Sequence, residues 1–204
     1  MRYRELKHIL DFIVASLSLL ALIPIFLIVY IGATISCKSH GIYKQKRIGL
    51  CGRPFVVFKF KSMRDITQNS DFLTSIDNPR ITKFGKIIRR SKLDEIPQLL
   101  NIIKGEMSFV GPRPDVPGYA DRLNQESTYV CKVKPGITCG ASLFFRDEEL
   151  ILKSVHNRQK FNDEVIWPKK VELNNNYAEN YSFKEDLRII FQTLGLIESK
   201  RFKI

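Results

Sequence analysis

An uncharged apolar run near the N-terminus constrains the fold of this chain more than any other feature. Residues 12–35 read FIVASLSLLALIPIFLIVYIGATI and contain no Asp, Glu, Lys or Arg. As a helix, this run is long enough to cross a hydrocarbon core of about 30 Å. A cleaved signal is not expected, because no small-residue cleavage site precedes the basic stretch that follows. The sequence therefore predicts a membrane-embedded domain at residues 1–38 and a second domain at residues 39–204.

Two features of the run argue against a straight crossing. Pro24 lies at its midpoint, where a proline removes a backbone hydrogen bond and bends a helix. Both flanks are basic, with Arg2, Arg4 and Lys7 before the run and Lys38, Lys44, Lys46 and Arg47 after it. Because positive flanks stay cytoplasmic, we expect a re-entrant helix that enters one leaflet, bends at Pro24 and returns. The alternative is a kinked helix that spans the bilayer.

The charge of the chain indicates an anionic partner. The 204 residues carry a formal net charge of +12, which suits nucleic acid, acidic lipid or a phosphorylated substrate. The four cysteines, Cys37, Cys51, Cys131 and Cys139, show no C-x-x-C spacing. We therefore predict reduced thiols, with neither a disulfide framework nor a zinc site.

The second domain alternates strand, helix and turn patterns, which indicates an α+β fold. FVVFKFKSM (55–63) predicts a strand, and ITKFGKIIRR (81–90) carries a helical apolar stripe. GPRPDVPG (111–118) predicts a rigid turn, and KPGIT (134–138) predicts a turn leading into a strand. FKEDLRIIFQTLGLI (183–197) places apolar residues on one face, so it is either a core helix or an amphipathic helix in the membrane interface. Asn174 to Asn176 are expected in a turn.

An adjacent pair of acids, Asp94 and Glu95, stands among basic residues in RRSKLDEIPQLLNIIKGEMSFVGPRP (89–114). One interpretation is a helix cap: Asp94 would be the N-cap, which places Pro97 in the first helical turn, where no N–H bond is lost. A cap explains one acid, but neither the second acid nor the arginines on both sides.

The other interpretation of the pair is phosphoryl transfer. An ionised Asp can attack phosphorus once the charge of the substrate is neutralised by a divalent cation, by arginines or by both. Glu95 is suited to hold Mg2+, which prefers carboxylate and phosphate oxygens. Arg89 and Arg113 offer planar forks that match phosphate.

The block DNPRITKFGKIIRRSKLDEIPQLLNIIKGEMSFVGPRP (77–114) resembles the signature of the bacterial sugar transferases, the small monotopic phosphoglycosyl transferases. The resemblance extends to FVVFKFKSM, KPGIT and the KHILDF stretch (7–12). It implies a re-entrant helix and a ping-pong transfer of a sugar 1-phosphate from a UDP-sugar to a polyprenol phosphate such as undecaprenyl phosphate. This would be the first membrane step of glycoconjugate and polysaccharide assembly, on the cytoplasmic face of the bacterial inner membrane, with glycosyltransferases acting downstream.

The resemblance also implies roles for individual residues. Asp94 would be the nucleophile, Glu95 and Asp94 would contact Mg2+, and Lys59, Arg89 and Arg113 would line the phosphate site. Arg146 sits where the family has an arginine after its Trp-Ala-Gln stretch, so we expect it to contact the phosphates of the nucleotide sugar. Pro24 would break the membrane helix.

The sequence departs from the family pattern in ways that concern the substrate. Cys139 to Ser142 replace the usual Gly-Trp-Ala-Gln, Asn174 replaces an Asp, and Ile23-Pro24 replaces Ser-Pro. About 16 extra residues lie between Arg146 and Trp167, relative to short family members. We expect the segment 147–166 to cover the sugar-binding side of the site, whereas the alternative is a tolerated surface insertion.

A binding module is the competing hypothesis: a membrane-anchored basic domain that holds nucleic acid or anionic lipid. Nucleic-acid binding favours basic residues interleaved with exposed aromatics, or a recognisable module. The sequence contains neither pattern, so we expect no nucleic-acid partner.

Overall fold

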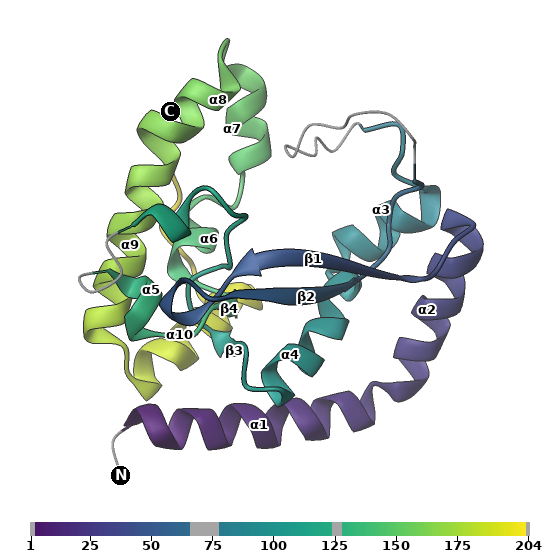
Figure 1. The fold of residues 1–204 in the computed structure, drawn as a ribbon, viewed down its shortest axis with the longest axis horizontal. Coiled ribbons are helices and arrows are strands. Elements are labelled where there is room, and N and C mark those ends of the chain that lie inside the picture. Colours follow the sequence, from purple (N-terminus) through teal and green to yellow (C-terminus); the bar gives the residue numbers. More distant parts are fainter. Residues whose placement is uncertain (1–2, 66–77, 124–127, 203–204) are drawn as a thin grey trace. The chain divides into compact units, whose positions relative to one another are not determined.

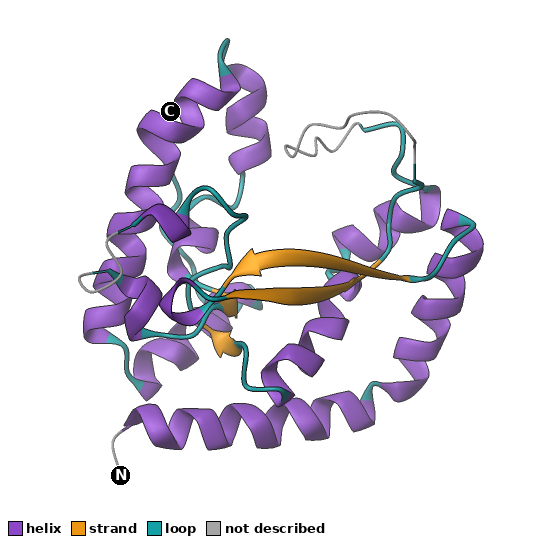
Figure 2. Ribbon diagram, in the orientation of Figure 1, coloured by secondary structure: helices purple, strands orange, loops and turns teal. Residues whose placement is uncertain are grey.

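The computed structural model describes residues 3–65, 78–123 and 128–202, and helices make up most of them (Figures 1 and 2). The strands form two small sheets, β1–β2 and β3–β4, which agrees with the predicted α+β class. The elements are α1 (Tyr3–Ala21), α2 (Ile23–Cys37), β1 (Ile42–Ile48), η1 (Leu50–Gly52), β2 (Pro54–Phe60), α3 (Lys83–Arg90), η2 (Leu93–Gln98), α4 (Leu99–Ile103), β3 (Ser108–Val110), η3 (Ala120–Arg122), α5 (Tyr129–Lys132), β4 (Gly136–Thr138), α6 (Gly140–Phe144), α7 (Glu148–Ser154), α8 (Arg158–Phe161), the π-helical η4 (Asn162–Ile166), α9 (Trp167–Asn180) and α10 (Phe183–Thr193).

The apolar run forms two helices, α1 and α2, that meet at a sharp bend. Within the described residues, no single helix is long and apolar enough to cross a membrane, whereas α1 and α2 pass that test as a pair bent by 68°. The break falls at Leu22, and Pro24 lies in the first turn of α2. A proline is tolerated there because the first N–H groups of a helix have no partner inside it. The predicted bend is confirmed, two residues before Pro24.

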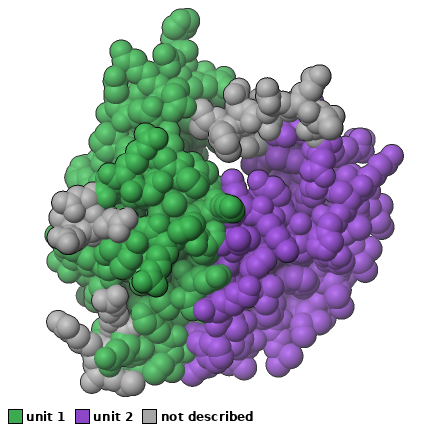
Figure 3. All heavy atoms as spheres, viewed as in Figure 1, with its two compact units in different colours: residues 1–11, 46–55, 105–204 green, residues 12–45, 56–104 purple. Residues whose placement is uncertain are grey.

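Packing divides the chain into two compact units (Figure 3). Unit 1 comprises Met1–Asp11, Lys46–Phe55 and Gly105–Ile204, and unit 2 comprises Phe12–Gln45 and Val56–Lys104. The chain passes from one unit to the other within α1, β1 and β2, and once more between Lys104 and Gly105 after α4. The predicted division at residue 38 concerns the membrane rather than packing, so it stays a prediction.

Unit 2 is built around Val29 of α2, Phe60 of β2 and Ile88 of α3, which are buried together. The strand and helix predicted at residues 55–63 and 81–90 are therefore confirmed as β2 and α3. Gly85 lies so close to the backbone oxygen of Ser62 that a side chain there has no room. This close approach explains the glycine in the first turn of α3.

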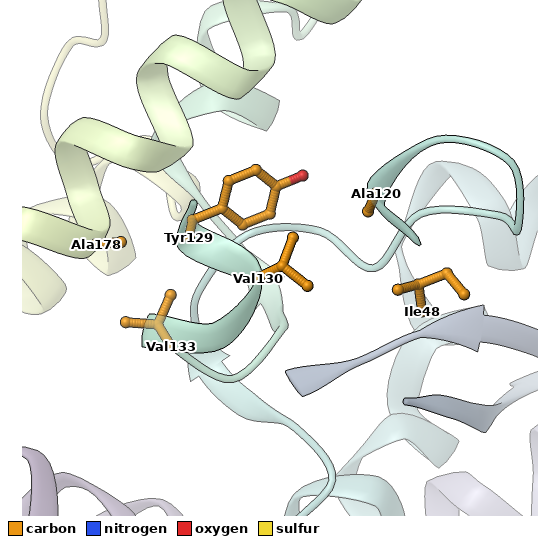
Figure 4. Close-up of a cluster of buried hydrophobic side chains, with 6 residues drawn as sticks. All are labelled: Ile48, Ala120, Tyr129, Val130, Val133 and Ala178. Atoms are coloured by element: carbon orange, nitrogen blue, oxygen red, sulfur yellow. The ribbon is translucent and has the colours of Figure 1, made fainter. Parts of the chain in front are cut away.

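Unit 1 contains a core between α5, α9 and the residues around η3 (Figure 4). Its buried members are Ile48, Ala120, Tyr129, Val130, Val133 and Ala178. The turn predicted at Asn174 to Asn176 is wrong, because these residues lie inside α9. Asn174 is buried there, and the packing of α9 on this core outweighs the weak helix propensity of asparagine.

Helix α10 buries Asp186 and Ile189, not the full apolar face expected from the sequence. Phe183 and Phe191 on that face are exposed, as are Leu194 and Ile197 just beyond the helix, whereas Ile190 is partly buried. The core interpretation therefore holds only for part of the face. All four cysteines are free, as predicted.

Candidate active site

The acid pair lies in η2, directly after a tight connection from α3. Thr82 caps α3 with its hydroxyl, which accepts a hydrogen bond of 2.8 Å from Gly85 N. Two residues after α3, Lys92 adopts the left-handed conformation with φ 58°, which costs a non-glycine residue about 1–2 kcal/mol. The chain re-enters a helix at once, so Asp94 and Glu95 fall in the first turn of η2.

The prediction that Asp94 is the N-cap is wrong. Lys92 holds that position, and no side chain forms a cap hydrogen bond there. The new helix, η2, is a 3-10 helix that contains Pro97 and ends at Gln98, and α4 begins at Leu99. The Asp94 carboxylate is therefore not committed to a backbone cap.

The Asp94 carboxylate is partly buried, and one of its oxygens lacks a hydrogen-bond donor within the described residues. Its Oδ1 atom is buried and has no hydrogen-bond partner among the described residues, and Arg89 Nη1 is in the same state. Such an unpaired buried atom costs about 1–3 kcal/mol. Burial raises the pKa of the Asp94 carboxyl, and the Glu95 charge raises it further, whereas Lys59, Lys92 and Arg89 lower it. An acceptor oxygen and a guanidinium N–H are thus both available for a ligand.

Glu95 is held by Lys59, which projects from β2. Lys59 Nζ lies 3.2 Å from Glu95 Oε1, and both side chains are largely buried. An ion pair with low exposure is screened little by solvent. The structure therefore brings together four of the predicted site residues, Lys59, Arg89, Asp94 and Glu95, within unit 2.

Arg113 and Arg146 belong to unit 1, and their part in phosphate binding stays a prediction. Arg113 is exposed in the Gly111–Pro114 turn, where Gly111 packs against the Lys134 carbonyl with no room for a side chain. Arg47 Nη1 donates to Pro114 O at 3.3 Å. Arg146 is also exposed and follows α6.

The segment 147–166 is only partly a surface insertion. Leu152 and Ile166 are buried with Phe145 in a small core, whereas residues 156–160 are exposed. In this segment Asp163 Oδ1 accepts a hydrogen bond of 3.0 Å from the Tyr119 hydroxyl. The exposed middle also carries contacts, because Asn157 caps α8 and Gln159 donates to the Tyr119 hydroxyl at 2.9 Å. The exposed residues whose side chains form no such hydrogen bond within the described part of the chain, His156, Arg158 and Lys160, are the part that is able to vary without a cost in packing.

The residues that depart from the family pattern have local structural roles. Cys139 Sγ caps α6 by accepting from Ser142 N at 3.3 Å. Asn174 hydrogen-bonds Tyr129, and the Tyr129 hydroxyl donates to Asp115 Oδ2 at 3.3 Å. Burial raises the pKa of Asp115 to about 6, although Lys170 and other neighbours lower it.

Sequence reasoning missed Lys92 and Asp115. The signal for Asp115 was its place directly after the GPRP turn. No pattern in the sequence predicted the left-handed conformation of Lys92, since a lysine in a basic run usually marks a solvated face.

The acid pair is suited to hold a metal only together with a substrate. Within residues 3–65, 78–123 and 128–202 no group of three or more His, Cys, Asp or Glu side chains is placed to bind a metal ion. Mg2+, however, is commonly bound by one or two carboxylates plus substrate phosphates and water. The unpartnered Asp94 oxygen and the adjacent Glu95 fit that mode.

Comparison with known proteins identifies relatives along almost the whole chain. The model of the bacterial sugar transferase family matches residues 2–200. The uncharacterized sugar transferase EpsL of Bacillus subtilis is 34% identical over 189 residues, which cover 93% of this chain and 85% of that protein.

Two longer relatives carry named activities. The UDP-glucose:undecaprenyl-phosphate glucose-1-phosphate transferase of Escherichia coli is 34% identical and covers 94% of this chain. The UDP-galactose-lipid carrier transferase of Erwinia amylovora is 30% identical and covers 95% of it. The chain spans 40% of the length of each of these two proteins.

Proposed function

Because the chain belongs to the bacterial sugar transferase family, we propose that it transfers a sugar 1-phosphate from a UDP-sugar to a polyprenol phosphate. The acceptor would be undecaprenyl phosphate, which the name of the E. coli relative contains. The observation that carries the proposal is the buried, unpartnered Asp94 oxygen beside Glu95, with the unpartnered Arg89 Nη1 in the same unit.

The first half-reaction uses Asp94 as the nucleophile. Its carboxylate oxygen attacks the phosphorus that carries the sugar, and the bond from that phosphorus to the bridging oxygen breaks. The bridging oxygen and its electron pair leave with UMP. The sugar phosphate is then bound to Asp94 as an acyl phosphate.

The second half-reaction regenerates the carboxylate. A phosphate oxygen of the polyprenol phosphate attacks the same phosphorus, and the bond to Asp94 breaks. The product is a polyprenol diphosphate sugar. Because UMP leaves before the acceptor reacts, this order corresponds to ping-pong kinetics.

The remaining residues neutralise and orient phosphate oxygens. Lys59 holds Glu95 beside Asp94, and Arg89 Nη1 offers a donor. Arg113 and Arg146 supply further guanidinium groups, which suit phosphate geometry. Asp94 and Glu95 would hold Mg2+, which would neutralise charge on the diphosphate.

The membrane course of the chain is part of the same proposal. The bent pair α1–α2 enters one leaflet and returns, with both basic flanks on the cytoplasmic face of the bacterial inner membrane. The exposed apolar residues at α10 and just after it lie in the membrane interface. There the polyprenol acceptor is within reach, and later glycosyltransferases are able to use the product.

One assay tests the proposal and separates it from a binding module. Purified protein is incubated with undecaprenyl phosphate, Mg2+ and a panel of UDP-sugars that includes UDP-glucose and UDP-galactose. Sustained UMP release that depends on undecaprenyl phosphate supports the transferase. Salt-sensitive retention of DNA without any UMP release supports the binding module instead.

A further inference from the structure

A buried polar cluster joins the first residues of α1 to α10 within unit 1. Lys7, Asp11 and Asp186 are all less than a tenth exposed. Asp186 Oδ2 accepts from Lys7 Nζ at 2.5 Å and from the Tyr3 hydroxyl at 2.7 Å. Its Oδ1 accepts from the Tyr177 hydroxyl at 2.6 Å. Three donors therefore satisfy this carboxylate.

Asp11 extends the cluster to strand β3. Its Oδ2 accepts from the Ser108 hydroxyl at 2.7 Å and lies 3.9 Å from Lys7 Nζ. Its Oδ1 accepts from Phe109 N at 3.5 Å. Ser108 is completely buried, so this contact is shielded from water.

Strand β3 is consequently held at its first two residues by Asp11. The Ser108 hydroxyl and Phe109 N both donate to the Asp11 carboxylate, whereas the single proton of the Tyr177 hydroxyl is used by Asp186. The same strand pairs in parallel with β4, where Ser108 faces Gly136 and Val110 faces Thr138. The register of β3 is thus defined by the cluster and by β4 together.

The Gly111–Pro114 turn follows β3 without an intervening residue. Gly111 N donates to Thr138 O at 3.0 Å, and Pro112 O accepts from Gly136 N at 2.9 Å. The backbone that carries Arg113 is therefore fixed by β3 and β4. Any shift of β3 along its axis moves the base of this arginine.

We propose that Asp11 and Ser108 are positioning residues for Arg113: their hydrogen bond locks β3 and so sets where the guanidinium meets the phosphates of the donor. A buried carboxylate is costly, and its best-attested use is to specify one arrangement. This inference rests on the proposed function, because it assigns Arg113 to donor binding.

The first test separates positioning from general stabilisation. Asp11→Ala and Ser108→Ala each remove the hydrogen bond, and each is expected to raise KM for the UDP-sugar about tenfold while kcat changes less than about twofold. Asp11→Asn keeps an acceptor for the Ser108 hydroxyl and is expected to stay within about twofold of wild type. Glu5→Gln, on an exposed position of α1, is the matched control. A lowered melting temperature with unchanged KM in both alanine variants overturns the proposal.

A double-mutant cycle gives the sharper result. In an Arg113→Ala background, Ser108→Ala is expected to add less than about a twofold change in KM, because the group that it positions is gone. In an Arg89→Ala background the full effect of about tenfold is expected to remain. Equal effects in both backgrounds overturn the positioning role. Absence of UMP release by the wild-type protein refutes the proposed function itself, which is a different outcome.

Discussion

Lys59 and Glu95, 36 positions apart in the sequence, form an ion pair with an Nζ–Oε1 distance of 3.2 Å. The contact ties β2 to η2, so the strand fixes the helix that carries both acids. It also places a positive charge near Asp94, where it lowers the pKa of a carboxyl that burial has raised. The pair therefore links the packing of unit 2 to the chemistry proposed for Asp94.

Glu95→Gln is expected to weaken the response to Mg2+. The amide removes a negative charge from the proposed metal site, so the Mg2+ concentration for half-maximal UMP release should rise about tenfold. The measurement is a Mg2+ titration of initial rates at a fixed donor concentration. Glu172→Gln, which alters an exposed ion pair with Lys169, is the control. An unchanged titration curve removes Glu95 from the metal site.

Asp115→Asn is expected to stabilise the protein at neutral pH. The pKa of Asp115 is raised from 3.8 to about 6, so the folded state binds this proton more tightly than the unfolded state. Its stabilising contribution is complete below pH 3.8 and is lost as the pH rises through about 6. The variant should gain up to about 3 kcal/mol in the free energy of unfolding at pH 7.5.

Urea unfolding at pH 7.5 and at pH 4 measures this difference between Asp115→Asn and wild type. The gain should shrink toward zero at pH 4, where the wild-type carboxyl is largely protonated in the folded state. Glu198→Gln, at an exposed position after α10, serves as the comparison. A gain of equal size at both pH values contradicts the linkage argument.

Both ends of the bent helix pair are expected to face the cytoplasm. Single cysteines at Glu5 and Lys44, both exposed, are introduced into a Cys51→Ser background and probed in intact cells with an impermeant thiol reagent. Neither should be labelled until the cells are lysed. Labelling of only one position indicates a helix that spans the bilayer. Pro24→Ala restores a backbone donor and should shift the population toward that spanning form.

The exposed part of the segment 147–166 is expected to influence the choice of donor sugar. Serine substitution of His156, Arg158 and Lys160 changes only exposed positions. It keeps the Asn157 cap and the Gln159 contacts and leaves buried Leu152 and Ile166 in place. The ratio of kcat/KM values between the best and second-best UDP-sugar should fall about threefold or more. Serine substitution of exposed Lys184 and Arg188 in α10 is the control. Unchanged donor preference shows that the segment is a tolerated insertion.

Local sequence patterns predicted α3 and the helix bend of unit 2, because each pattern is compatible with few backbone conformations. The apolar spacing of residues 81–90 and the Thr82 cap specify α3, and a proline in an uncharged run specifies a bend. The cap assignment of Asp94 failed because the left-handed Lys92 starts η2 earlier, and such a conformation leaves no pattern in the sequence. The turn predicted at Asn174 to Asn176 was wrong because the packing of α9 outweighs the weak helix propensity of asparagine.

The sequence predicted which residues form the candidate site, but not which of their atoms are buried or hydrogen-bonded. The acid pair and its basic neighbours are visible in the sequence, and Lys59 joins them because β2 pairs with β1 and packs beside α3. The unpartnered atoms of Asp94 and Arg89 could not be predicted, since burial depends on contacts between distant segments. For the same reason the Asp11–Ser108 hydrogen bond, across 97 positions, was not foreseen.

The most direct test of a covalent intermediate on Asp94 is the mass of the intact protein after incubation with a UDP-sugar and Mg2+ in the absence of any polyprenol phosphate. Ping-pong transfer through Asp94 predicts one added sugar phosphate on the wild-type protein, its loss when undecaprenyl phosphate is supplied, and no addition to Asp94→Asn. That variant should remain folded, because the amide has nearly the shape of the carboxyl. Wild-type protein that releases UMP only when the acceptor is present, and never gains this mass, would contradict a covalent intermediate on Asp94. Addition of the same mass to folded Asp94→Asn would contradict the choice of nucleophile.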